Sequence, residues 1–201
     1  MQDRIINTAC ELFMERGIRS VTMDEIAAHL GISKRTLYEM FANKDELLEK
    51  SIDYMRQEWH NKMEQIIKET PSCILGLLNV LKYSTEQHNM NKTPKDIFYS
   101  DLRKCRPDLI KRHNEHRHSH ILLMAKHLGK GIKQGTVRKN LNLSLASTLL
   151  MAQVEGLESV KTMREYSHVE IFTTLVLSFC RGISTEKGLK EIEDFERENN
   201  L

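Results

Sequence analysis

The stretch that decides the fold is GISKRTLYEMFANKDELL, residues 31–48. Its leading glycine can adopt the positive φ that ends a helix, and Ser33 is a preferred N-cap for the next one. That next helix places Leu37 and Phe41 four residues apart on one face, so its polar residues are left on the other faces. Asn43 then caps another helix almost at once. The stretch therefore predicts a short helix between two tight turns, with a polar face directed outward.

The residues before this stretch predict two more short helices. Thr22-Met-Asp-Glu25 is a capping box, in which the threonine hydroxyl accepts the Glu25 amide and the Glu25 carboxylate accepts the Thr22 amide. The helix that it begins ends at Leu30. An apolar stripe predicts a first helix over residues 3–16, and a glycine follows it. With a turn of about three residues between the second and third helices, the arrangement is a helix-turn-helix pattern.

The rest of the chain also shows helical periodicity. A long fourth helix is predicted over residues 43–69, before Thr70 and Pro71. Only three prolines and nine glycines interrupt the chain, and no run alternates with period two. Further helices are predicted near residues 72–90, 94–103, 107–128 with a continuation toward 134, 143–163 and 168–183, followed by a polar tail or short last helix. We therefore predict an all-α fold, with a three-helix N-terminal domain at residues 1–48 and a larger helical domain at 49–201.

Composition narrows the class of protein. The 201 residues are 40% hydrophobic and 29% charged, which is typical of a globular chain and too apolar for disorder. The four cysteines show no metal-binding spacing, so we expect reduced thiols in a cytosolic protein. No leader-like apolar segment and no run of ~18 apolar residues occurs. We expect a cytoplasmic protein that does not interact with membranes.

The outward-facing residues around the third helix are suited to nucleic acid. Lys34 and Arg35 lie on its first turn, the part of a recognition helix that meets base edges. Thr22 and Lys44 begin the flanking helices, where free amides together with a hydroxyl or an ammonium group suit phosphate oxygens. Tyr38 can offer its ring to a thymine methyl group or its hydroxyl to a phosphate. The net charge of this region does not by itself indicate nucleic-acid binding, because residues 1–50 carry seven Lys/Arg and nine Asp/Glu.

These residues resemble a known family. The pattern TxxEIAxxLGISKxTLYxxFxxKxELL at Thr22–Leu48, with AxxLFxxxG at Ala9–Gly17, is similar to the DNA-binding domain of the TetR (tetracycline-repressor-like) transcriptional regulators. The resemblance implies a homodimer in which the first three helices bind double-stranded DNA. It also implies that residues 49–201 form a ligand-binding and dimerisation domain, whose last two long helices make a four-helix interface.

The resemblance also implies roles for single residues. Five residues match positions that touch the phosphate backbone: Thr22, Ser33, Thr36, Tyr38 and Lys44. Lys34 and Arg35 match positions that often contact bases, and an arginine at the second position is compatible with a guanine contact. The implied function is a repressor that binds a near-palindromic operator and responds to an unidentified small-molecule effector, without a cofactor.

The predictions for the larger domain are less specific. An effector pocket would be lined by apolar and aromatic residues that could equally be ordinary core: Met55, Trp59, Met63, Tyr83, Phe98, Tyr99, Leu102 and Met124. A dimer interface would use residues that burial within one monomer would also explain: Ala146, Ala152, Gly156, Phe172, Leu175, Val176 and Phe179.

Two alternatives remain open from the sequence, and a third is not expected. His113, His116 and His120 share one helical face, which would suit a metal-responsive regulator, although a solvated face explains the same spacing. A helical adaptor for protein interactions would explain the apolar C-terminal helices but not the outward cations. An enzyme is not expected, because the sequence contains no nucleophile-base spacing, no phosphate-binding glycine loop and no HExxH.

Overall fold

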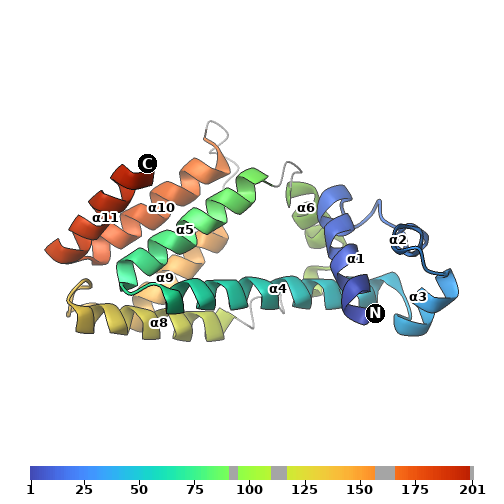
Figure 1. Ribbon diagram of the computed structural model, residues 1–201, viewed down its shortest axis with the longest axis horizontal. Coiled ribbons are helices and arrows are strands. Elements are labelled where there is room, and N and C mark those ends of the chain that lie inside the picture. Colours follow the sequence, from blue (N-terminus) through green and yellow to red (C-terminus); the bar gives the residue numbers. More distant parts are fainter. Residues whose placement is uncertain (91–94, 110–116, 157–165, 200–201) are drawn as a thin grey trace. The chain divides into compact units, whose positions relative to one another are not determined.

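The computed structural model describes residues 1–90, 95–109, 117–156 and 166–199, and it confirms the all-α prediction (Figure 1). No strand occurs within these ranges; the one extended contact that they contain is an isolated antiparallel bridge between Val137 and Ser184. The chain forms two compact units, each described below by itself. Unit 1 comprises the described parts of 1–62 and 91–115, and unit 2 those of 63–90 and 116–201.

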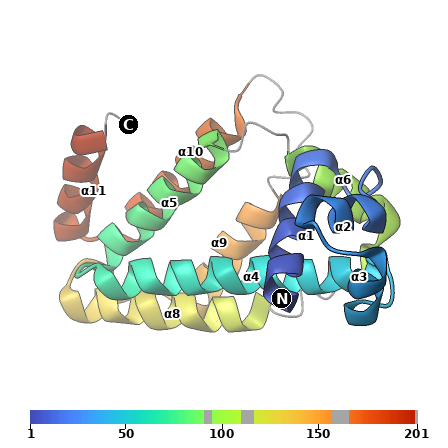
Figure 2. The same ribbon diagram turned by 45° about the vertical axis from the view of Figure 1, so that its right-hand side comes forward.

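Unit 1 is built from short helices around a single apolar core. Its helices are α1 (Gln2–Arg16), α2 (Met23–Leu30), α3 (Lys34–Met40), the first part of α4 (Lys44–Glu69) and α6 (Lys95–Cys105) (Figures 1 and 2). Phe13 of α1, Ile26 of α2 and Leu37 of α3 are completely buried, and the two leucines that begin α4 join them. This packing fixes α3 through one apolar face and leaves its other faces in solvent.

The α6 segment belongs to the core of unit 1, which the sequence analysis did not predict. Phe98 and Leu102 of α6, with Leu109 just after it, pack in the same cluster as Leu37 and Phe41. Each of these residues is at most 5% exposed. Residues from the middle of the sequence therefore complete the small N-terminal helical unit.

Polar contacts hold the same segment in place. Asp101 accepts the backbone N–H of Arg19 at 3.0 Å. Gly17 has φ +82°, and a Cβ there would lie 2.6 Å from the Ile97 side chain, so glycine is required both by conformation and by space. Arg106 donates to Asp108 at 2.7 Å and lies 3.6 Å from Asp45 at the start of α4. The loop before α2 and the first turn of α4 are thus both tied to residues 97–109.

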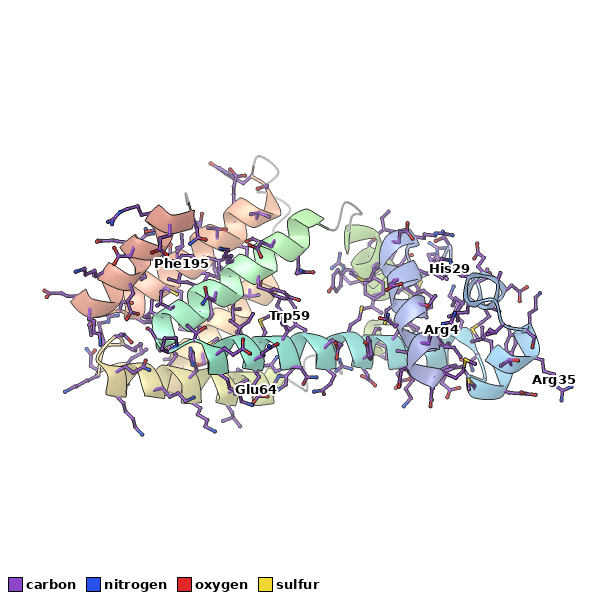
Figure 3. The ribbon with its side chains drawn as sticks, in the orientation of Figure 1. Arg4, His29, Arg35, Trp59, Glu64 and Phe195 are labelled. Atoms are coloured by element: carbon purple, nitrogen blue, oxygen red, sulfur yellow. The ribbon has the colours of Figure 1, made fainter. Side chains whose placement is uncertain are left out.

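Unit 2 is a bundle of longer helices. It contains the end of α4, α5 (Cys73–Met90), α8 (Arg117–Gln134), α9 (Leu143–Gly156), α10 (His168–Ile183) and α11 (Glu186–Asn199). Its core includes Leu78 of α5, Leu128 of α8 and Cys180 of α10. The chain end, expected as a polar tail or short last helix, is the helix α11, which buries Ile192 and Phe195 (Figure 3).

The predicted helices agree closely with the structure where it is described. The helix predicted at 107–128 with a continuation toward 134 corresponds to α8, which ends at Gln134, while residues 110–116 lie outside the description. The helix predicted at 143–163 is described as far as Gly156. The two compact units are defined by packing and not by function. The predicted assignment of DNA binding to residues 1–48 and of ligand binding and dimerisation to residues 49–201 therefore stays a prediction. Within the described ranges, no helix combines the length and apolar character that crossing a membrane requires.

Candidate nucleic-acid interface

The turn into α2 is the predicted capping box. The Glu25 amide donates to the Thr22 hydroxyl oxygen at 3.2 Å, and the Glu25 carboxylate accepts the Thr22 amide at 2.8 Å. The Thr22 hydroxyl also donates to that carboxylate at 2.9 Å. These donors hold the pKa of Glu25 below its usual value. Gly31 ends α2 in the left-handed conformation, with φ 67°.

Helix α3 is fixed by its cap and by one buried side chain. The Ser33 hydroxyl oxygen accepts the Thr36 amide at 3.0 Å, and the two hydroxyl groups lie 2.8 Å apart. Leu37 is completely buried, whereas Tyr38 is 50% exposed. Figure 3 shows Arg35 projecting away from α3 into solvent. The sequence thus orients the helix so that its first-turn cations face outward.

All seven predicted DNA-contact residues lie in unit 1, on α2, α3, α4 or their caps. Five are exposed and two are half-buried, Thr36 and Lys44. Burial lowers the pKa of Lys44, while the acidic groups around it act in the opposite direction. The residues are therefore in one small unit with accessible side chains, and their contacts with DNA stay a prediction.

Acidic residues that the sequence analysis missed stand beside the predicted base-contacting cations. The Lys34 ammonium forms an ion pair with Asp24 of α2. The Arg35 Nε donates to the Glu39 carboxylate at 2.8 Å, one turn along α3. The second pair could have been found from its i, i+4 spacing. The first joins residues ten apart across a turn, and only the packing of α2 against α3 reveals it.

The predicted effector-pocket residues do not assemble in one unit. Unit 1 contains Met55, Trp59, Phe98, Tyr99 and Leu102, and unit 2 contains Met63, Tyr83 and Met124. Phe98 and Leu102 are core residues packed with Leu37, and Trp59 is 42% exposed. Apolar residues with helical spacing could not be distinguished from core by sequence. The eight residues divide between the two units, and their role in a pocket stays a prediction.

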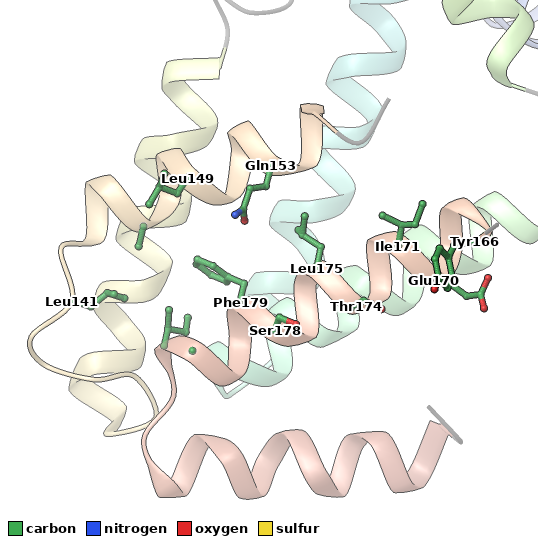
Figure 4. A pocket seen from close by; sticks show the side chains of 13 residues that line it. Leu141, Leu149, Gln153, Tyr166, Glu170, Ile171, Thr174, Leu175, Ser178 and Phe179 are labelled. Carbon is green, nitrogen blue, oxygen red and sulfur yellow. The ribbon is translucent and has the colours of Figure 1, made fainter. Parts of the chain in front are cut away.

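Unit 2 carries an open, mainly apolar groove of about 770 Å³ between α9 and α10. Leu149 and Gln153 of α9 face Leu175 and Phe179 of α10 across it (Figure 4). Leu149 is 53% exposed, and Leu145, one turn earlier on α9, is 54% exposed. Large apolar side chains are thus left in solvent along one face of this unit.

The predicted interface residues divide around this groove. Ala146, Leu175 and Phe179 line it. These three also pack in or against the core of unit 2, as do Val176 and Phe172, which do not line the groove. Neither Ala152, which is exposed, nor Gly156, which is half-buried, is among the lining residues. The sequence analysis missed several residues of this face: Leu141, Leu149, Gln153, Tyr166 and Ile171. Apolar spacing along α9 and α10 could have indicated Leu149 and Ile171, whereas Leu141 and Tyr166 lie outside both helices and Gln153 is polar.

The histidine prediction falls largely outside the description, because residues 110–116 include His113 and His116. Among the residues that are described, no group of three His, Cys, Asp or Glu side chains could hold a metal ion.

His127 is buried, and its Nε2 lies 3.0 Å from the Cys73 carbonyl oxygen. The three buried cysteines have raised pKa values, about 11 for Cys10 and about 12 for Cys73 and Cys180, because burial disfavours the thiolate.

Comparisons with known proteins agree with this geometry. The family described as "Bacterial regulatory proteins, tetR family" matches residues 5–50. The chain is 23% identical over 182 residues to the fatty acid metabolism regulator protein of Bacillus subtilis, covering 90% of this chain and 94% of that protein. It is 40% identical over 53 residues to the negative transcriptional regulator IcaR of Staphylococcus epidermidis, 26% of this chain and 29% of that protein.

A solved structure shows the same fold. A transcriptional regulator from Saccharomonospora viridis, in complex with choline, superposes with a TM-score of 0.72 at 19% identity, covering 92% of this chain and 98% of that one. Each of these proteins is named as a regulator. The match over residues 5–50 identifies the N-terminal part of the chain as a tetR-family domain of bacterial regulatory proteins, and the chain shares the helical fold of a solved transcriptional regulator.

Proposed function

We propose that the protein is a homodimeric, effector-responsive repressor that binds a near-palindromic operator through the α3 helix of each copy. The observation that carries the proposal is the surface of α3. One residue, Leu37, anchors the helix in the core, while Lys34, Arg35 and Tyr38 are exposed on its other faces. A short helix that buries one apolar face and presents cations from its first turn is suited to the major groove.

Phosphate contacts would set the register of α3 on the duplex. The candidates are the cap and flanking residues: Thr22, Ser33, Thr36, Tyr38 and Lys44. Three of these hydroxyl groups are already engaged, since Thr22 donates to Glu25 and Ser33 shares a hydrogen bond with Thr36. A hydroxyl group can rotate its proton toward a phosphate oxygen, so a contact with DNA would replace these local bonds.

The groove of unit 2 supports the homodimer. A second copy of α9 and α10 would cover Leu145, Leu149 and the apolar floor between them, and would form a four-helix bundle. Two copies related by a twofold axis present two α3 helices, which requires an operator with two inverted half-sites. Helix-turn-helix dimers place such half-sites about 34–36 Å apart.

The continuous helix α4 supports the effector response. Its first turns pack in the core of unit 1, and its last turns belong to unit 2. An effector that binds one conformation of unit 2 more tightly would shift the population of α4 positions, and with it the separation of the two α3 helices. Fatty acids and choline are the first compounds to test, since one relative is named for fatty acid metabolism and another was solved with choline.

The proposal is tested by selecting duplexes from a random-sequence DNA pool with the full-length protein. The expected result is enrichment of one near-palindrome with two half-sites, which then loses affinity when an active effector is added. IcaR, a negative regulator, suggests that a bound promoter is repressed. Selection of no sequence above the starting pool would contradict the proposed function.

A further inference from the structure

Each of the two cations proposed to contact bases is held by a carboxylate of its own unit. Lys34 forms an ion pair with Asp24, and Arg35 with Glu39 at 2.8 Å. These pairs are in solvent: the Lys34 side chain is 65% exposed and that of Arg35 88%. Neither carboxylate satisfies a buried charge, so each exposed pair adds at most about 1 kcal/mol to stability, and the pairing of both proposed base-contacting cations invites a functional reason as well.

Acidic residues are also frequent in the rest of the N-terminal region. Residues 1–50 contain nine acids and seven Lys/Arg, although this part of the chain carries the proposed DNA surface. The carboxylate of Glu25 is near enough to Lys44 to act on it electrostatically. Lys34 and Arg35 are therefore partly neutralised before DNA arrives, and Lys44 lies among acidic groups.

Such neutralisation affects the two kinds of DNA binding differently. Non-specific affinity comes from neutralised phosphates and the counterions they release, so a cation already paired with a carboxylate contributes less. An exposed ion pair shifts the equilibrium between the paired and the unpaired side chains by a factor of about two to five. A bidentate contact to the correct guanine edge discriminates by about tenfold or more. The correct base can therefore displace the carboxylate, whereas a generic phosphate competes with it poorly.

We propose that Asp24 and Glu39 are specificity-determining residues, which hold Lys34 and Arg35 away from the phosphate backbone and release them to the correct bases. This rests on the proposed function, because it assigns these carboxylates a role in operator selection. Their contribution is a lower affinity for the wrong DNA, achieved by competition and without any contact to a base.

The test compares Asp24→Asn and Glu39→Gln with the wild-type chain. Fluorescence anisotropy gives the affinity for the selected operator and for a shuffled duplex of the same length and composition. Each variant should bind the shuffled duplex about two- to fivefold more tightly, with a smaller change on the operator. The ratio of the two affinities should fall, and the gain on shuffled DNA should shrink as salt is raised. Glu193→Gln, an equal charge change on α11, should leave the ratio unchanged.

Double variants test whether each carboxylate acts through its cation. In a Lys34→Ala background, Asp24→Asn should no longer raise affinity for shuffled DNA. If the gain persists, Asp24 repels phosphates directly and the inference is overturned. If Glu39→Gln instead weakens operator binding and leaves shuffled DNA unaffected, Glu39 itself contacts a base, which also overturns it. Thermal melting checks folding, since Asp24 lies in the first turn of α2.

The two possible failures can be told apart. If the wild-type chain binds both duplexes equally, the proposed function and this inference fail together. If the wild-type chain prefers the operator and both variants keep the wild-type ratio, only the inference fails.

Discussion

In unit 1, α2 and α3 present charged and hydroxyl side chains, and most of these are engaged by a close neighbour: Thr22 by Glu25, Ser33 by Thr36, Lys34 by Asp24. In unit 2, α9 presents Leu145 and Leu149 to solvent beside α10, and both leucines are more than half exposed. A polar surface with its groups already oriented suits a ligand that exchanges one hydrogen bond for another, as DNA does. An open apolar surface suits a partner that excludes water from it.

Leu37→Ala gives the largest expected effect and separates the two surfaces. The side chain is completely buried beneath α3, so its truncation should lower the free energy of unfolding by about 2–5 kcal/mol. Urea denaturation measures this change. Operator binding should be lost along with the α3 geometry, while association through unit 2 persists at temperatures where the variant stays folded. Loss of association with DNA binding retained would reverse the assignment of the two surfaces.

Arg35→Ala removes one side chain of the polar surface without touching the core. We expect it to cost about 1–3 kcal/mol of operator binding and to relax base preference at one position of each half-site. Repeating the selection with this variant shows which position is affected. An unchanged preference at every position would mean that Arg35 does not contact a base.

Lys44→Ala should act uniformly on all DNA sequences. As a phosphate contact, Lys44 should contribute about one unit to the slope of log affinity against log salt concentration. Its partly buried site limits its reach, so the loss of affinity should be smaller than for Arg35. The role would be wrong if the salt slope of the variant equals that of the wild-type chain.

The smallest effect concerns unit 2 and pH. Burial lowers the pKa of His127, only partly opposed by the Cys73 carbonyl. The histidine is therefore neutral in the folded state, and its unfolded value is near 6.5. His127 binds a proton more readily in the unfolded chain than in the folded one. Its contribution to the free energy of unfolding is therefore fully present above pH 6.5 and is lost as the pH falls toward the lower folded pKa. His127→Gln should flatten this part of the stability profile, measured by thermal melting. Identical profiles would exclude the histidine as the source.

The same contrast explains how much the sequence could predict. The capping residues Thr22, Ser33 and Asn43 act on backbone groups within three positions, so local pattern located α2, α3 and the start of α4. The packing of Phe98 against the N-terminal helices depends on tertiary structure, so no local sequence pattern predicts it. Leu149 resembles a core residue in sequence, since helical spacing states that a face is apolar but not what covers it.

The central claim is that the polar surface of unit 1 contacts DNA while the groove of unit 2 pairs two copies. Its most direct test is a titration of the full palindrome and of a single half-site with the wild-type chain and with Leu149→Glu, which places a charge in the groove. We predict that the wild-type chain binds the full site far more tightly than the half-site, by about 100-fold or more through linked binding of two half-sites. The monomeric variant should bind both duplexes alike. A variant that keeps the wild-type preference for the full site would contradict the account.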